Sequence, residues 1–418
     1  MLLAAVIAAL AIAPPRVDHV TDHSARISAD APVRVEYGTS TGYGLYASGG
    51  PGVVTLPSLA ASTTYHLRID GGADQTFTTA RPAAVSHSLR IGPRRSLLLD
   101  GRPFIPIMQW LQCPWRFAAE RALGINVFMG RGCSNNGDAD EVAQTAALGA
   151  YSIIPFDRSV ARAPGLLAWR SDDEPDLNHV SVAKVAATTG RGHPRLTFST
   201  ITSAFFGPTK KNVPSRAYAA AADVVGTDVY PISGYCRPDL IQWQADSTRE
   251  LVRLARPRQP VYSWIEAVSS ASQWCKGRGV LPAELRAEVW MTLVNGATAI
   301  GYFTHSWKPT YTQFRVGPAL QRELKRTNRQ VTTLTPAILG APLRLTVRGV
   351  QAIGRTYHGA RYVFAVNVTH APVTAAITAG DGTWQVFEER RTVAAAGGVL
   401  HDAFAPLAVH LYVLPPAR

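Results

Sequence analysis

The chain has 418 residues, of which 46% are hydrophobic and 17% are charged. This apolar content exceeds what one core of ordinary size needs, so it predicts two or three folded domains and excludes a mainly disordered chain. The 42 Lys and Arg residues outnumber the 29 Asp and Glu residues, which gives a net charge of +13. Because the basic residues are scattered and not gathered in a stripe with interleaved aromatic residues, we expect no nucleic-acid partner.

Residues 1–13 form a short apolar run that ends in Ala-Ile-Ala. Such a run is typical of a secretory signal peptide with a small-residue cleavage site. No basic residue precedes the run and Pro14 follows it, so an uncleaved anchor or a misplaced start codon remains an alternative. No other stretch has the roughly 18 to 20 apolar residues of a membrane-spanning helix. We therefore expect a secreted, extracellular monomer with no membrane span after cleavage.

Residues 16–80 alternate apolar and polar residues in short runs between turns, which predicts a small β-sandwich. The segment LPSLAASTTYHLRI followed by QTFTTA resembles the end of a fibronectin type III domain, and this resemblance makes Tyr65 a tyrosine corner. The segment is short for that fold, so one strand could be missing. With no binding motif on it, we expect a spacer or adhesion module.

Residues 81–95 form a linker with a leading strand, and residues 96–335 then alternate short apolar runs with longer amphipathic stretches. Such alternation is typical of parallel strands with crossover helices. Eight candidate strands are found, at 104–110, 125–130, 151–156, 165–170, 195–201, 223–230, 260–268 and 297–305. They predict a (β/α)8 TIM barrel in the α/β class. The gap between the third and fourth runs is too short for a full helix, so we expect a turn there.

Residues 336–418 return to alternation, with turns at Asp381-Gly382 and Gly397-Gly398. This pattern predicts a second, C-terminal antiparallel β-sandwich.

Acidic residues end two of the barrel runs. Glu174 follows the fourth run in WRSDDEPDL, and Glu266 ends the seventh in VYSWIEAV. Active sites of such barrels lie at the C-terminal ends of the strands, and a carboxylate within WIEAV is costly to bury without a partner or a purpose. Hydrolysis of a glycosidic bond needs two carboxyl groups that flank the sugar. The fourth and seventh strands lie on opposite sides of a barrel mouth, so these two glutamates fit that requirement.

With these residues, the region 96–418 resembles the clan-A glycoside hydrolases. The string PGLLAWRSDDEPD is similar to the clan segment that ends the fourth strand, which gives Glu174 the acid/base role, and WIEAV gives Glu266 the nucleophile role. Asp173 stands where much of the clan has Asn, which puts the contact with the sugar 2-hydroxyl in doubt. Repulsion from Asp173 would raise the pKa of Glu174, as suits a general acid.

Further polar and aromatic residues end the other strands and are candidates for substrate binding. They are Gln109, Trp110, Arg131, Asp173, Asp228, Tyr230, His305 and Trp307. Trp307 is similar to the clan's aromatic platform, on which a sugar stacks. Each of the others has a structural alternative, such as an ion pair between Arg131 and Asp228. Three other tryptophans, Trp115, Trp274 and Trp290, are expected to be packing or rim residues.

The four cysteines follow strand ends. Cys113 and Cys133 follow the first and second strands, and Cys236 and Cys275 follow the sixth and seventh. We therefore predict the disulfides 113–133 and 236–275, which would hold neighbouring loops at the barrel mouth in an oxidising compartment. No pair has C-x-x-C spacing, so no zinc site is expected.

These features predict a secreted retaining glycoside hydrolase that acts on a polysaccharide or cell-wall glycan and needs no cofactor and no metal. The sugar, the linkage and the choice between endo and exo action stay open. One alternative is a non-catalytic carbohydrate-binding or adhesion protein on a hydrolase-derived barrel. Another is a different enzyme on the same scaffold, since fold does not fix function.

Overall fold

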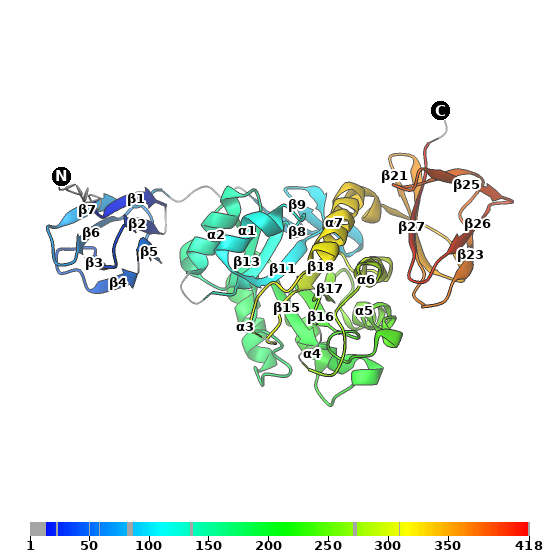
Figure 1. Cartoon of the computed structure of the whole chain (residues 1–418), viewed down its shortest axis with the longest axis horizontal. Helices are drawn as coiled ribbons and strands as arrows, with labels where there is room; N and C mark the ends of the chain where they lie inside the picture. The colour runs from blue at the N-terminus through cyan, green and yellow to red at the C-terminus, as the bar shows by residue number, and fades with distance from the viewer. Residues whose placement is uncertain are drawn as a thin grey trace, which may run out of the picture. The chain divides into compact units, whose positions relative to one another are not determined.

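The computed structural model describes residues 14–21, 24–49, 51–57, 59–81, 87–133, 137–270, 274–308 and 310–416. The predicted signal peptide, residues 1–13, lies outside the described residues, as do residues 82–86 of the predicted linker. The chain divides into two compact units, one built mainly on the N-terminal strands and one holding the barrel and the C-terminal sheet (Figure 1). Within the described residues, no helix is both long and apolar enough to cross a membrane.

The N-terminal strands form two antiparallel sheets. One has the order β1 (Arg16–Val20), β2 (Ala25–Ala29), β5 (Gly52–Leu56), and the other the order β4 (Leu45–Gly49), β3 (Val33–Gly38), β6 (Thr64–Ile69), β7 (Gln75–Thr78). Alternate residues of β2, β3 and β6 are buried, as the sequence pattern predicts; in β3 these include Val33 and Val35. These described strands number seven, so the segment is short without losing a strand.

Tyr65 links the loop before β6 to the core of this unit. Its hydroxyl accepts a hydrogen bond from the backbone N–H of Ala60 at 2.9 Å, and its ring stacks on Phe77 with the centroids 5.6 Å apart. A tyrosine that bonds the backbone a few residues upstream is the arrangement of a tyrosine corner.

A small antiparallel sheet precedes the barrel, formed by β8 (Leu89–Ile91), β9 (Leu97–Leu99) and β10 (Arg102–Phe104). Eight parallel strands then close into a barrel, which confirms the predicted architecture. In order they are β11 (Ile107–Gln112), β12 (Val127–Arg131), β13 (Tyr151–Pro155), β14 (Leu166–Arg170), β15 (Thr197–Thr202), β16 (Val224–Asp228), β17 (Val261–Glu266) and β18 (Ala299–Phe303). Each overlaps a predicted run, because strands covered on both faces are apolar throughout.

Helices connect most of the barrel strands. They are α1 (Pro114–Arg121), α2 (Asp138–Ala147), α3 (Val182–Gly192), α4 (Ser215–Ala220), α5 (Trp243–Leu254), α6 (Pro282–Val294) and α7 (Pro318–Ile338). Between β13 and β14 the chain forms a 3-10 turn, Arg158–Val160, as the short gap predicts.

The C-terminal strands form a nine-stranded antiparallel sheet. Its order is β19 (Ala341–Leu343), β21 (Gln351–Tyr357), β22 (Ala360–Val366), β27 (Val409–Leu414), β24 (Gly382–Val386), β25 (Arg391–Ala396), β26 (Val399–Phe404), β23 (Val373–Thr378), β20 (Thr346–Arg348). The predicted C-terminal antiparallel domain is confirmed. Its strands belong to a continuous sheet that curls around a core with Trp384, Leu400 and Tyr412 at 0% exposure, in place of two separate sheets.

The curled sheet and the barrel share a hydrophobic core. Phe364 of β22 stacks on Trp290 of α6 with the centroids 5.5 Å apart, and both side chains are fully buried. The Arg286 guanidinium of α6 donates a hydrogen bond to the backbone oxygen of Val409 at 2.9 Å. Trp290 is thus a packing residue, and the sheet supports the outer helices of the barrel.

Candidate active site

A cavity of about 340 Å³ opens at the C-terminal ends of β14, β15 and β16. It is lined by Glu174, Leu177, Thr202, Ser203, Ala204, Thr209, Lys211, Asp228, Val229, Tyr230, Gly234, Tyr235 and Trp274. Its volume is that of a small-molecule pocket, and its position is the one at which barrels of this kind place their active sites. Of the two sequence-predicted catalytic residues, Glu174 lines this cavity and Glu266 does not.

Glu174 is held by the tight loop that follows β14. Its backbone oxygen accepts hydrogen bonds from the N–H groups of Leu177 and Asn178, at 3.0 and 2.9 Å, so the loop turns back on itself. The buried Asp176 carboxylate accepts bonds from the backbone N–H and the hydroxyl of Thr202, at 3.0 and 2.6 Å, which ties the loop to β15. Glu174 itself has φ of 41°, a left-handed conformation unusual for a residue with a side chain. Such backbone strain occurs at functional sites.

Asp228, the last residue of β16, meets Glu174 in this cavity. The two side chains lie within hydrogen-bonding reach of each other, so the two carboxyl groups share a proton. Burial, and next the charge of Glu174, raise the pKa of Asp228 well above its usual value. Burial and the neighbouring charge therefore favour the protonated form of Asp228.

Asp173 adds a third carboxyl group beside the pair. The residue is exposed at the surface, yet enough protein surrounds its carboxyl group that the loss of hydration, together with the charge of Glu174, raises its pKa to about 6. Arg170 opposes this rise in the pKa of Asp173, and its guanidinium also lies over the Trp110 ring, 5.4 Å from the centroid. Among the described residues, no group of three or more His, Cys, Asp or Glu side chains is arranged to hold a metal ion.

Glu266 lies beneath the loop that follows β16, with 0% of its surface exposed. Its carboxylate accepts hydrogen bonds from the backbone N–H groups of Ile232, at 2.7 Å, and of Ser233. It also shares a hydrogen bond with the fully buried Glu288 of α6. Burial raises the pKa of Glu266 and, with the adjacent Glu266 charge, raises that of Glu288 well above its usual value. The structure therefore gives Glu266 the surroundings of a loop anchor.

Aromatic rings continue from the cavity along its rim. Tyr230 stacks on Phe303 and Trp274, with centroids 5.1 and 6.2 Å away. Trp307 stacks on Phe303 at 6.2 Å and contacts Tyr311 at 5.6 Å. Trp274, Trp307 and Tyr311 are each about half exposed, at 52%, 50% and 50%. Their rings form a surface on which the apolar face of a sugar could stack.

The other predicted binding residues lie around this site without lining the cavity. Gln109 is fully buried and donates a hydrogen bond to the Thr304 hydroxyl at 2.7 Å. His305 is 2% exposed and bonds the backbone oxygen of Trp110 at 3.1 Å, and burial lowers the pKa of its imidazole. Arg131 ends β12, half-buried. These side chains belong mainly to the barrel interior.

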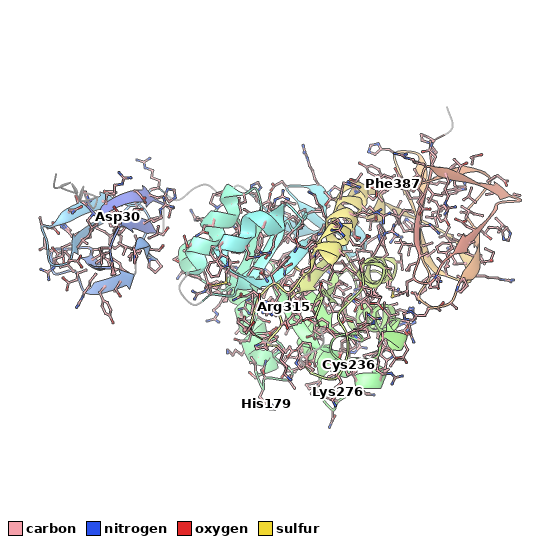
Figure 2. The ribbon with its side chains drawn as sticks, in the orientation of Figure 1. Asp30, His179, Cys236, Lys276, Arg315 and Phe387 are labelled. Atoms are coloured by element: carbon pink, nitrogen blue, oxygen red, sulfur yellow. A yellow bond between two sulfur atoms is a disulfide. The ribbon has the colours of Figure 1, made fainter. Side chains whose placement is uncertain are left out.

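Both predicted disulfides are present. Cys113 and Cys133 have Cα atoms 5.4 Å apart, and Cys236 and Cys275 have Cα atoms 6.1 Å apart. Figure 2 labels Cys236 together with Lys276, the neighbour of Cys275, and shows both in the loops on the lower side of the barrel. The second disulfide thus joins the β16 loop, which carries Tyr230, to the β17 loop, which carries Trp274.

Trp274, which the sequence analysis expected to be a packing or rim residue, lies half exposed at the rim and also lines the cavity. Sequence reasoning missed Lys211 and Tyr235, which contribute a cation and a phenol to the lining. Both lie in loops beyond strand ends, where no periodicity fixes the direction of a side chain. The sequence holds no local signal that could have found them.

The fold is similar to those of several solved glycoside hydrolases. An alpha-amylase from Geobacillus thermoleovorans, complexed with acarbose, aligns with a TM-score of 0.50 and 10% identity, over 75% of this chain and 99% of that one. A proposed alpha-galactosidase/melibiase from Bacteroides fragilis NCTC 9343 aligns with a TM-score of 0.50 and 11% identity, over 96% and 98%. A structure named only as a glycoside hydrolase gives a TM-score of 0.50 and 10% identity, over 79% and 97%. No protein-family model and no curated protein matches the chain.

Proposed function

We propose that this protein is a retaining glycoside hydrolase in which Glu174 is the nucleophile and Asp228 the general acid/base. The observation that carries the proposal is the pair of carboxyl groups sharing one proton in a cavity with an aromatic rim. The likeness of the barrel to those of solved glycoside hydrolases supports it as a fold-level analogy.

The position of the pair follows from barrel geometry. Asp228 is the last residue of β16, the sixth strand, and Glu174 lies in the loop that follows β14, the fourth strand, so both lie at the mouth formed by the C-terminal ends of the strands. Carboxyl groups about 5 to 5.5 Å apart serve retaining hydrolysis, whereas inverting enzymes need a wider gap that admits a water molecule. Glu174 and Asp228 are within hydrogen-bonding reach, which is closer than either separation, so a bound sugar would have to part them. Parting them to the shorter, retaining separation needs the smaller movement, which favours retention.

The raised pKa of Asp228 supports the two roles. Asp228 holds the proton and can transfer it to the glycosidic oxygen as the bond to the anomeric carbon breaks. The Glu174 carboxylate attacks that carbon and forms a glycosyl ester. Asp228, now ionised, then takes a proton from water, whose oxygen attacks the anomeric carbon and releases Glu174. The roles thus differ from the sequence expectation, since Glu174 changes from acid/base to nucleophile and Asp228 replaces Glu266.

Three matched amide variants test the assignment on aryl glycosides and a panel of polysaccharides. Glu174→Gln should abolish turnover of every substrate. Asp228→Asn should lose roughly 100- to 10,000-fold on polysaccharides, the usual contribution of general acid catalysis. It should retain formation of the glycosyl ester from aryl glycosides with acidic leaving groups, because these need no proton. Glu266→Gln should keep measurable turnover of both substrate types.

Reducing-end release and the configuration of the first product provide the readouts. A silent Glu266→Gln beside an active Asp228→Asn would return the nucleophile role to Glu266. First products of inverted configuration would contradict the retaining mechanism. Binding of glycans without turnover in the wild type would favour the non-catalytic carbohydrate-binding alternative.

We also propose that the protein works outside the cell, where its two disulfides persist. In this proposal the N-terminal strands act as a fibronectin type III-like spacer or adhesion module, and the substrate is a polysaccharide or cell-wall glycan. Mass mapping of non-reduced protein from the culture medium tests secretion and pairing together. Recovery of the full-length chain only from the cytoplasm would contradict the proposal.

A further inference from the structure

The cavity lining includes one basic residue, the exposed Lys211, together with the acidic residues Glu174 and Asp228. Lys211 lies in the loop that follows β15, and backbone hydrogen bonds fix its main chain. Its N–H donates to the oxygen of Ala204 at 2.9 Å, and its oxygen accepts from Val213 at 3.0 Å. The lysine therefore has a defined place at the cavity wall.

Hydroxyl groups surround this part of the wall. The Thr209 hydroxyl bonds the backbone oxygen of Ser203 at 2.6 Å and the Ser203 hydroxyl at 3.1 Å. The Tyr235 phenol also hydrogen-bonds the Ser203 side chain. All three residues line the cavity together with Lys211. An ammonium group beside several hydroxyls is the donor set that recognises an anionic group.

The charge of Lys211, compared with the other charges in the cavity, bears on the charge of the substrate. Glu174 and Asp228 share one proton, so together they carry about one negative charge. Among the ion pairs of the described residues, none involves Lys211. The Asp172 carboxylate, two residues before Glu174 in the sequence, pairs with Lys184 at 2.9 Å. A neutral sugar would leave the Lys211 ammonium facing hydroxyl groups, whereas an acidic sugar would pair with it.

We infer that the substrate carries an anionic substituent, a carboxylate, sulfate or phosphate, on the sugar that Lys211 contacts. The inference rests on the proposed function, because it names the substrate class of that same cavity. The net charge of +13 fits this class, since a positively charged protein associates faster with an anionic polymer.

The test compares Lys211→Ala with the wild type on matched pairs of glycosides that differ only in the anionic group. Suitable pairs are glucuronides against glucosides, and sulfated or phosphorylated sugars against their unmodified parents. Lys210→Ala is the control, because Lys210 is an exposed neighbour that does not line the cavity. Both kcat/KM and equilibrium binding by calorimetry are measured on every pair, at low and high salt.

The wild type should prefer one anionic member, and Lys211→Ala should lose roughly tenfold to a hundredfold of that preference, the usual effect of one charged hydrogen bond. Lys210→Ala should behave as the wild type. Lys211-dependent binding of an acidic sugar without hydrolysis would support the inference and contradict the proposed function. Equal or better hydrolysis of the neutral members would overturn the inference alone. An equal loss on both members in Lys211→Ala would also overturn it, because the lysine would then act on the carboxyl pair.

Discussion

Asp173 and Asp228, which both lie beside Glu174, show how one small volume raises the pKa of two carboxyl groups to different extents. Loss of hydration is the largest cause for each, and the charge of Glu174 adds to it. The pKa of Asp228 lies well above its usual value, while that of Asp173 is about 6. Asp173 is thus a charge that appears as the pH rises through about 6.

This arrangement predicts the pH profile of Asp173→Asn. Above pH 6 the Asp173 anion raises the pKa of Asp228, so it keeps the general acid protonated. Removing that charge lowers the pKa of Asp228, and the alkaline limb of kcat/KM should move down by roughly one pH unit. The profile at pH 4 to 5 should be unchanged, because Asp173 is protonated there. An alkaline limb that stays in place would remove Asp173 from the titrating cluster.

The loop after β16 depends on a buried anchor. Glu266 bonds the backbone N–H groups of Ile232 and Ser233, and the same loop carries Tyr230 to the cavity and Cys236 to its disulfide. Unpaired backbone groups in this position would cost about 1 to 3 kcal/mol. We propose that the carboxylate serves the site through the loop that it holds.

Glu266→Gln should loosen this loop. The glutamine has one oxygen acceptor for two backbone N–H groups, and its own N–H group would face one of them. We expect faster hydrogen exchange at Ile232 and Ser233, and a KM that rises more than kcat falls. Glu288→Gln is the control, because its amide still donates to Glu266. Unchanged exchange together with a complete loss of kcat would contradict the anchor role.

The sequence predicts elements here better than it predicts the depth of a side chain. The eight strands were found because a strand covered on both faces is an apolar run whatever its neighbours are. Asp228 and Glu266 both end such runs, and the residues next to them in the sequence do not show which of the two is buried. Their difference arises from a loop of another strand that closes over Glu266 and leaves Asp228 open to the cavity.

In the larger of the two compact units, the barrel and the curled sheet are continuous. Phe364 and Trp290 belong to one buried cluster that also includes residues of α7 and β27. A barrel and a sheet that share a core of this kind should unfold together, because unfolding of either one exposes the apolar surface of the other to water.

Phe364→Ala should therefore destabilise the barrel as well as the sheet. Truncation of a buried phenylalanine costs about 3 to 5 kcal/mol. Calorimetry should show one transition for both parts, shifted to lower temperature in the variant, with loss of activity at the same temperature. The control is Tyr357→Ala in β21 of the same sheet, at a side chain that is 36% exposed, which should cause a much smaller shift. A separate early transition for the sheet that leaves activity intact would contradict the shared core.

The left-handed backbone at Glu174 affects which substitutions can accumulate at this position during evolution. Glycine adopts this conformation without strain, and asparagine does so more readily than glutamate. Replacing Glu174 by either would make the fold easier to maintain while it removes the proposed nucleophile. A lineage released from selection for chemistry would thus drift toward glycine or asparagine here. The residue found at this position in related chains would then record whether their sites are still in use.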